Sequence, residues 1–505
     1  MNIKQAKEEI KHTVQAYLKK DETGNYQIPA IRQRPVLLIG PPGIGKTQIM
    51  EQIARECKIG LVAYTITHHT RQSAVGLPFI KEEEFEGKTY SITEYTMSEI
   101  IASVYRKMKE SGLKEGILFI DEINCVSETL APTMLQFLQC KTFGNQAVPE
   151  GWIIVAAGNP PEYNKSVREF DMVTLDRVRC MQVEADLNVW KEYARAQHVN
   201  SAILSYLELH PGNFYRVEAD VDGLLFVTAR GWEDLSNLMD VYEQLQLPMN
   251  EETIHEFLRH PDVAEDFAAY VDLYQKYQDD YGIPEILEGK VKPAVYARIY
   301  NAAFDERFSV VNLLLDGLSN QFCRVQEEKA VLDRWYLFLK EYQKAVKSAE
   351  EPKHCYEELV ANEEVLYQQK KKSGLLTAAD GKCYEQFLKQ IRASGEHLQN
   401  AANSIQAKES FFLVKEDFDL QHQKLDALEE KTASAVEHAF TFMEEAFEKG
   451  QEMVVFVTGL TVTPEAALFL SEHACERYRQ YNQELLIGTR RAELLSELQM
   501  GESDH

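Results

Sequence analysis

An apolar run that ends in a glycine-rich turn is the feature that most restricts how this chain folds. Val36–Ile39 (VLLI) lead into residues 40–47, whose letters GPPGIGKT match the pattern G-x-x-x-x-G-K-[ST]. A buried strand would end here, and small residues would let the backbone curl with its N–H groups inward. The helix that follows would add partial positive charge from its N-terminus. The pattern therefore predicts a phosphate-binding loop between a strand and a helix.

The residues after the loop support this prediction. Apolar side chains recur at three- and four-residue spacing from Ile49 to Cys57, which is typical of a helix with one buried face. Lys46 would reach the β- and γ-phosphates of ATP, and the Thr47 hydroxyl would bind Mg²⁺. The candidate nucleotide-binding residues are Gly40, Pro41, Pro42, Gly43, Ile44, Gly45, Lys46, Thr47 and Gln48.

Two adjacent carboxylates follow a second apolar run. Residues 117–120 (ILFI) end in Asp121 and Glu122. Beside a phosphate-binding loop, Asp121 would hold Mg²⁺ and Glu122 would polarise the attacking water, because phosphoryl transfer depends mainly on positioning and charge stabilisation. The alternative is a pair of helix-capping residues after a core strand.

A third apolar run ends in an amide side chain. Residues 152–157 precede Gly158, Asn159 and Pro160. At the tip of a strand beside the Asp121 strand, Asn159 can orient the attacking water or contact the γ-phosphate. The alternative is that Asn159 only caps a turn before the two prolines.

The remaining pattern predicts an α/β region followed by helices. Strands are predicted at 36–39, 61–66, 117–120, 152–157 and 179–183, and helices at 47–57, 97–110 and 129–139. This alternation is typical of a parallel sheet. From residue 185 onward no strand series is evident, and helices are predicted at 228–245, 252–278, 305–345 and 421–447.

Finer predictions concern the C-terminal half. The segment 370–374 (KKKSG) is the strongest candidate for a loop, and Thr463 with Pro464 would open a helix that runs to Tyr481. Residues 453–458 fit either a strand or a buried helical turn. The aromatic residues Trp335, Tyr336, Phe338 and Tyr342 are expected in a helix core.

Composition narrows the class of protein. The net charge of −26 argues against sequence-independent nucleic-acid binding, although a local basic pore in an assembled ring would escape that argument. Eight scattered cysteines without a C-x-x-C pair indicate reduced thiols. The N-terminal segment is a charged amphipathic helix rather than a signal peptide, and no run of 18 apolar residues occurs. We therefore expect a cytoplasmic protein with no membrane span.

With these motifs in this order, residues 25–245 resemble the AAA+ ATPases, and within them the MoxR-like branch. In that branch a hairpin, here at about 141–151, precedes the strand that ends in Asn159, and a second insertion, here 79–96, precedes the Asp121 strand. The resemblance implies a three-layer α/β/α P-loop domain with a helical lid, followed here by a large all-α region. The implied domains are 1–19 (N-terminal helix), 20–184 (nucleotide-binding), 185–290 (lid) and 291–505 (all-helical).

The resemblance also assigns two arginines. Arg177 matches the arginine finger that enters a neighbouring subunit's site, with Arg179 as the second candidate, and a local salt bridge of Arg177 with Asp176 as the structural alternative. A trans-acting arginine implies a ring of identical subunits, most often a hexamer. Arg230 resembles the sensor-2 arginine of the lid. A cation in the first turn of a helix opposes the helix dipole, so an anion is expected nearby: a nucleotide phosphate, or alternatively Glu233 or Asp234.

Such families remodel or activate partner proteins, commonly ones with a von Willebrand factor A domain, at the expense of ATP. Two other classes stay open: a nucleic-acid motor subunit, and a nucleotide-gated scaffold with little turnover. His68 and His69 are expected in structural or subunit contacts rather than in a metal site. Tyr163 and Lys165 suit either a substrate-facing or an exposed loop.

Overall fold

The structure is a computed structural model that describes residues 1–66, 76–85, 87–143, 146–163, 167, 170–220, 223–347, 351–400 and 406–485. The chain divides into two compact units. The first comprises Met1–Val189, Thr228–Arg230 and Val365–Ala378, and the second comprises the rest of the chain.

A parallel five-stranded sheet forms the centre of the first unit. The strands are β1 (Val36–Ile39), β2 (Gly60–Thr65), β5 (Gly116–Asp121), β8 (Trp152–Gly158) and β9 (Arg179–Gln182), in the order β2-β5-β8-β1-β9. All five predicted strands are confirmed. Because β8 lies between β5 and β1, the carboxyl ends of the strands that carry the two carboxylates and the amide meet beside the end of β1.

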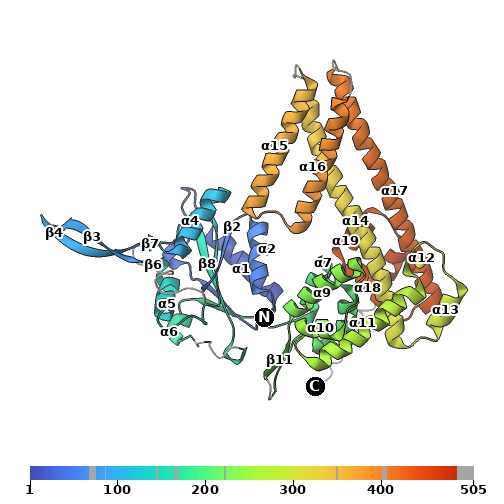
Figure 1. Ribbon diagram of the computed structural model, residues 1–505, viewed down its shortest axis with the longest axis horizontal. Coiled ribbons are helices and arrows are strands. Elements are labelled where there is room, and N and C mark those ends of the chain that lie inside the picture. The colour runs from blue at the N-terminus through green and yellow to red at the C-terminus, as the bar shows by residue number, and fades with distance from the viewer. Residues whose placement is uncertain are drawn as a thin grey trace, which may run out of the picture. The chain divides into compact units, whose positions relative to one another are not determined.

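Helices cover both faces of this sheet. They are α1 (Ile3–Tyr17), α2 (Lys46–Cys57), α4 (Glu99–Ser111), α5 (Ala131–Cys140) and the short α6 (Met172–Leu175). The predicted helices at 47–57, 97–110 and 129–139 are confirmed within two residues at each end. Figure 1 shows α1 and α2 on one side of the strands and α5 on the other.

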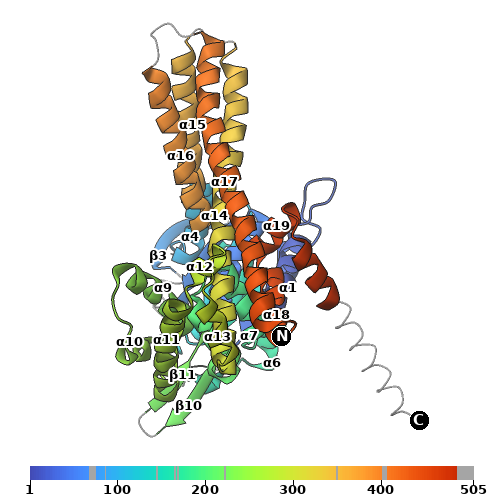
Figure 2. The same ribbon diagram turned by 90° about the vertical axis from the view of Figure 1, so that its right-hand side faces the viewer.

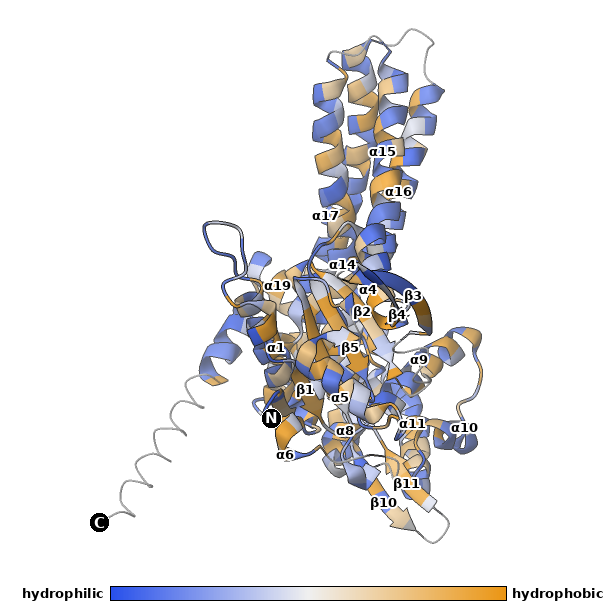
Figure 3. Ribbon diagram, turned by 90° about the vertical axis from the view of Figure 1, so that its left-hand side faces the viewer, coloured by the Kyte–Doolittle hydropathy of each residue, from blue (hydrophilic) through white to orange (hydrophobic). Residues whose placement is uncertain are grey.

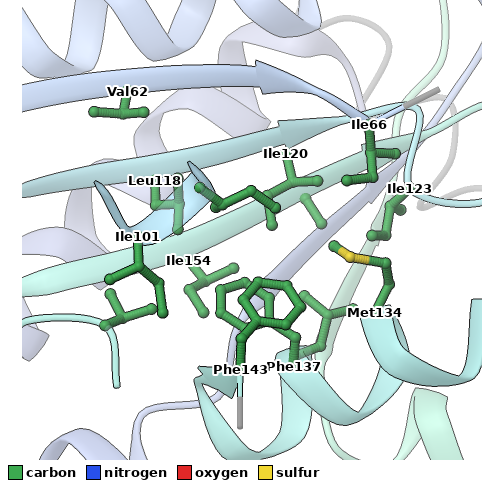
Figure 4. Packing of buried hydrophobic residues seen from close by; sticks show 14 of the residues in the cluster. Val62, Ile66, Ile101, Leu118, Ile120, Ile123, Met134, Phe137, Phe143 and Ile154 are labelled. Carbon is green, nitrogen blue, oxygen red and sulfur yellow. The ribbon is translucent and has the colours of Figure 1, made fainter. Parts of the chain in front are cut away.

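One face of the sheet packs a continuous apolar cluster against α4 and α5. Leu118, Ile120 and Ile154 from the strands contact this cluster, in which Phe137 and Phe143 stack with ring centroids 4.0 Å apart (Figure 4). Figure 3 shows apolar residues along β1 and β5. Strands buried on both faces read as continuous apolar runs, which is why the sequence revealed them.

Two hairpins interrupt the α/β alternation where insertions were predicted. β3 (Pro78–Phe85) pairs with β4 (Lys88–Tyr95) before the β5 strand, and β6 (Thr142–Phe143) pairs with β7 (Gln146–Ala147) before β8. Both are antiparallel. The long β3–β4 hairpin projects from the rest of its unit (Figure 1).

A buried lysine lies at the junction of α5 and the β6–β7 hairpin. Lys141 is 9% exposed, and its ammonium donates to the carbonyl oxygen of Ala30 at 2.7 Å. Burial lowers its pKa from 10.5 to about 8. The folded state therefore binds this proton less readily than the unfolded state does. Below pH 8 the buried charge of Lys141 lowers the free energy of unfolding by its full amount. This destabilisation disappears as pH rises from about 8 to about 10.5.

We expect Lys141→Met to stabilise the protein at pH 7 by about 2 kcal/mol, because about 3 kcal/mol of charge burial is removed and one hydrogen bond is lost. The gain should shrink as pH rises from about 8 to about 10.5. Calorimetric unfolding of variant and wild type at pH 7 and at alkaline pH measures both effects. A difference that does not change with pH would contradict the assignment.

The second unit begins with short elements. They are α7 (Leu187–Ala196), α8 (Ser201–Leu209), β10 (Arg216–Asp220), β11 (Gly223–Val227), α9 (Ala229–Leu245), α10 (Glu251–Phe257), α11 (Pro261–Tyr281), α12 (Ile283–Leu287) and α13 (Pro293–Tyr300), although α7 and α9 each begin in the first unit. The antiparallel pair β10–β11 contradicts the expectation of helices alone after residue 185. Arginine, glutamate and aspartate in β10 have low strand propensity, so pairing rather than composition decides this hairpin.

The predicted helix 252–278 is also corrected. It is divided between α10 and α11, and Pro261 stands at the start of α11. Proline has no N–H to donate inside a helix, whereas the first helical turn requires none.

Further helices follow. They are α14 (Phe304–Ala345), α15 (Pro352–Ser373), α16 (Ala378–Gln399), α17 (Ala407–Phe447), α18 (Gln451–Val462) and α19 (Pro464–Glu472), of which residues Val365–Ala378 belong to the first unit. Parts of α14 to α17 lie side by side as a bundle (Figures 1 and 2). Its core is aromatic: the Tyr356 ring lies edge-on to those of Phe338 and Tyr342. Trp335 is buried as well, as predicted, whereas Tyr336 is 47% exposed.

Three predictions for this region need comment. The lysines at 370–372 belong to the last turn of α15, and the chain leaves the helix only at Gly374, whose φ is +73°. Residues 453–458 are helical, within α18. The helix opened by Pro464 stops at Glu472 instead of reaching Tyr481, because His473 adopts an extended conformation.

Among the described residues, no single helix has the length and apolar character needed to cross a membrane. Only α18 and α19 taken together, across a bend of 87°, meet those two criteria.

Candidate nucleotide-binding and hydrolytic site

The glycine-rich segment forms a loop between β1 and α2. Gly43 and Gly45 have φ of +73° and +92°, a conformation that side chains disfavour. A Cβ on Gly40 would lie only 2.6 Å from the carbonyl oxygen of Val183. The helix begins directly after the loop, at Lys46. These positions explain why the loop requires glycine, and the N-terminus of α2 provides a site that favours an anion.

Lys46 lies at the centre of the site and is 8% exposed. Its ammonium donates to the carbonyl oxygens of Gly40 and Pro41, both at 2.8 Å, and to Asn159 Oδ1 at 2.9 Å. Burial is the main cause that lowers its pKa to about 8, while the carboxylate of Asp121 opposes the shift. A phosphate beside this ammonium would favour its charged form.

The residues predicted to hold Mg²⁺ are in direct contact. Thr47 Oγ1 donates to Asp121 Oδ2 at 3.1 Å, so a hydroxyl oxygen and a carboxylate oxygen lie next to each other at the end of β5. Oxygen ligands of this kind suit Mg²⁺, which usually takes one or two protein ligands and completes its shell with water and phosphate. The described residues contain no group of three or more histidine, cysteine, aspartate or glutamate side chains that could hold a metal. The donor set therefore fits a magnesium ion that arrives with a nucleotide.

Glu122 adopts an unusual backbone conformation. Its φ is +56°, which is rare for a residue with a side chain, and its N–H donates to Asp121 Oδ1 at 2.9 Å. The carbonyl oxygen of Glu122 accepts from Cys125 N at 2.9 Å, which closes a tight turn. Such strain persists where the surrounding structure enforces it, and it is concentrated at functional sites.

Asn159 joins this group through Lys46. It directly follows β8, the neighbour of β5 in the sheet. Its backbone oxygen accepts from the side chain of Asn124 at 2.8 Å. Asn124 was not predicted from the sequence. The sequence offers one feature that could have pointed to Asn124, its position three residues after Asp121. That spacing does not indicate a chemical role.

The two candidate finger arginines differ in their contacts. Arg179 donates to Thr13 and to Glu9 Oε2 of α1, so it serves as a local tie between α1 and the edge strand β9. Arg177 is exposed and donates to Gln139 of α5, and no described ion pair joins it to Asp176. It contacts none of the loop or carboxylate residues described above.

Arg230 lies next to the loop. Its backbone N–H donates to the carbonyl oxygen of Gly43 at 3.1 Å, and its side chain contributes to lowering the pKa of Lys46. In the described part of the chain Arg230 forms no ion pair, and Glu233 instead accepts a hydrogen bond from Tyr193. The first residues of α9 therefore belong to the same compact unit as the loop.

Three further predictions lie wholly or partly outside the described residues. His68, His69 and Lys165 are not among them, so their expected roles stay untested. Tyr163 is partly exposed at the end of a short 3₁₀ turn, and burial raises the pKa of its hydroxyl.

Together, the loop, the carboxylate pair and the strand-end amide define a P-loop nucleoside-triphosphate site on a parallel α/β domain. Residues 36–174 match the model of the ATPase family associated with various cellular activities (AAA). The chain thus holds an AAA domain, followed by a large all-helical C-terminal region, and the match supports a general ATPase activity. No curated protein matches the chain at a significant level.

A substitution in the loop tests its geometry. We expect Gly43→Ala to weaken ATP binding about tenfold, because an alanine at positive φ costs about 1–2 kcal/mol. Its Cβ would also lie 3.0 Å from the Thr228 side chain. Titration with a fluorescent ATP analogue measures the change. The control is Gly24→Ala, at φ +88° with no atom within 4 Å, which should leave ATP affinity unchanged.

Proposed function

We propose that the protein is an ATP-hydrolysing MoxR-like AAA+ ATPase that remodels or activates a partner protein. The observation that carries the proposal is the convergence of three chain segments. Lys46 contacts Asn159 at 2.9 Å, and the neighbouring Thr47 contacts Asp121 at 3.1 Å. These contacts bring three groups together: the loop that would hold phosphates, the carboxylate that suits Mg²⁺ and the amide at the end of the neighbouring strand.

Each residue has a role in hydrolysis. Lys46 and the backbone N–H groups of the loop hold the β- and γ-phosphates, while Thr47 and Asp121 hold Mg²⁺. The ion supplies charge stabilisation for the phosphate oxygens when it is bound. Glu122 orients the attacking water and accepts its proton, and Asn159 contacts the γ-phosphate.

Conformational coupling would begin at α9. The hydrogen bond from Arg230 N to Gly43 O ties the first turn of this helix to the loop backbone, and the Arg230 guanidinium would reach a phosphate. Differential contacts in the ATP and ADP states would then shift the helix that follows.

Arg177 is proposed to act between subunits. It is exposed and contacts no described residue of its own phosphate loop, so we propose that it acts on the site of a neighbouring subunit in a homo-oligomeric ring, which the family resemblance implies is a hexamer. Next to it, Met172 and Val173 of α6 are 83% and 52% exposed, which suits a surface that a second subunit covers.

The branch is proposed from the two hairpins. β3–β4 and β6–β7 occupy the positions that the MoxR-like resemblance implies, one before β5 and one before β8. A partner with a von Willebrand factor A domain is proposed from that resemblance.

The experiment that tests the proposal begins with turnover. Purified wild type should hydrolyse ATP in the presence of Mg²⁺, and Lys46→Ala should not, whereas Lys109→Ala, an exposed control on α4, should retain full activity. Glu122→Gln purified with ATP should then retain a specific protein that Lys46→Ala does not retain. Nuclease-sensitive nucleic acid in the trapped complex would instead favour a motor subunit. Absence of turnover in wild type would favour a scaffold.

A further inference from the structure

Asn124 is a buried polar residue in an otherwise apolar environment, at the end of the strand that carries the carboxylates. It is 5% exposed, and its neighbours Ile123 and Val126 are 2% and 5% exposed. Its Nδ2 donates to the backbone oxygen of Asn159 at 2.8 Å. Buried polar side chains are costly unless they hydrogen-bond, so this position needs a reason.

The segment that contains Asn124 crosses the end of β8 at two points. Ile123 N donates to Ala157 O at 2.9 Å, and Asn124 Nδ2 donates to Asn159 O. The turn from Glu122 to Cys125 is thus bound to the strand that carries Asn159. Because Glu122 is held at positive φ by the same turn, its orientation depends on these two bonds.

Only one of the two polar atoms of the Asn124 amide is hydrogen-bonded. Its Oδ1 is buried and has no partner among the described residues. A Cβ on Gly158 would lie 2.5 Å from that oxygen and 2.8 Å from Asn124 Cγ, so only glycine leaves room for the amide. Asn124 thus leaves one buried acceptor of its own unpaired, while it supplies the donor for the backbone oxygen of Asn159.

We propose that Asn124 is a positioning residue for ATP hydrolysis, which sets Glu122 and Asn159 relative to each other by binding the carboxylate turn to the end of β8. This inference rests on the proposed hydrolytic function. Asn124 itself contacts neither substrate nor attacking water. It acts through Glu122 and Asn159, because a small displacement of residues beside the reacting phosphate lowers the rate of hydrolysis strongly.

Asn124→Leu tests the proposal because it removes the donor and the unpaired acceptor at similar volume. We expect kcat to fall about 100-fold, with the dissociation constant for ATP unchanged and the unfolding temperature close to that of wild type, because one unpaired acceptor is removed while the oxygen of Asn159 loses its donor. Gly158→Ala should lower kcat in the same way, because its methyl group displaces the amide. The matched control is Val126→Ala, a buried residue of the same segment without a bond to β8, which should lower the unfolding temperature and leave kcat unchanged.

A double-variant comparison separates positioning from stability. If Asn124 acts through Glu122 and Asn159, then Asn124→Leu should lower kcat by a smaller factor in the Asn159→Ala background than in wild type, because part of the positioning effect is already lost. Additive losses, or a loss of kcat that follows the unfolding temperature as in Val126→Ala, would overturn the proposal. If wild type did not hydrolyse ATP, the proposed function would fail. If wild type hydrolysed ATP and Asn124→Leu were fully active, only the positioning role would fail.

Discussion

Arg177→Ala should lower the ATP turnover rate by about 10³- to 10⁵-fold while the variant still binds ATP, because a trans-acting arginine stabilises charge that develops only in the transition state. The matched control is Arg179→Ala. In wild type the Arg179 guanidinium donates to Thr13 and Glu9 of α1. The Arg179→Ala variant should therefore unfold at a lower temperature and keep the ATP turnover rate of wild type. Steady-state turnover and nucleotide titration of both variants measure these effects.

Mixed oligomers make the Arg177 test specific. A Lys46→Ala subunit retains Arg177, and an Arg177→Ala subunit retains its phosphate loop. Each variant alone should be inactive, and their mixture should recover part of the activity, because an intact loop then meets an intact arginine across the interface. No recovery on mixing, together with an oligomer of normal size, would argue that Arg177 acts within its own subunit or only in folding.

Glu122→Gln should lower kcat by about 10²- to 10⁴-fold, which is the usual contribution of a positioned general base. Glutamine keeps the size of the side chain and can adopt the same backbone conformation at φ +56°, but it cannot accept the proton of the attacking water. ATP should therefore bind and remain unhydrolysed. Single-turnover measurements with radiolabelled ATP separate binding from the chemical step.

The control for Glu122→Gln is Glu150→Gln, a substitution of the same type at an exposed position before β8. It should not change turnover. Equal activity of Glu122→Gln and wild type would exclude Glu122 as the base and leave the turn at 122–125 with a structural role only.

The sequence predicted the elements that depend on local chemistry. The central strands β1, β5 and β8 are apolar runs because both faces of the sheet are buried there, and the loop needs glycine at two positive-φ positions. The same local logic located Asp121 and Asn159 at strand ends and Lys46 at the start of a helix. It failed for the β10–β11 hairpin, in which β10 carries charged residues, and for the end of the helix that Pro464 opens, which stops before an extended His473.

The order of the strands was decided by the tertiary structure. A sequence motif places Asn159 after a strand but does not state which strands lie beside it, and only the order β2-β5-β8-β1-β9 brings its side chain to Lys46. The choice between Arg177 and Arg179 was open in the sequence, since both precede or begin the same strand. The structure shows only that their contacts differ: Arg179 donates to α1, whereas Arg177 donates to Gln139 of α5.

What the sequence alone determined is therefore the set of chemical groups and the local backbone that presents each of them. What only the tertiary structure decided is which groups meet, and through which intermediaries such as Asn124. The physical reason is the distance along the chain between the residues that interact. A phosphate loop, a strand or a cap is specified by a few adjacent residues. A hydrogen bond between residues 124 and 159 depends instead on how separate segments pack.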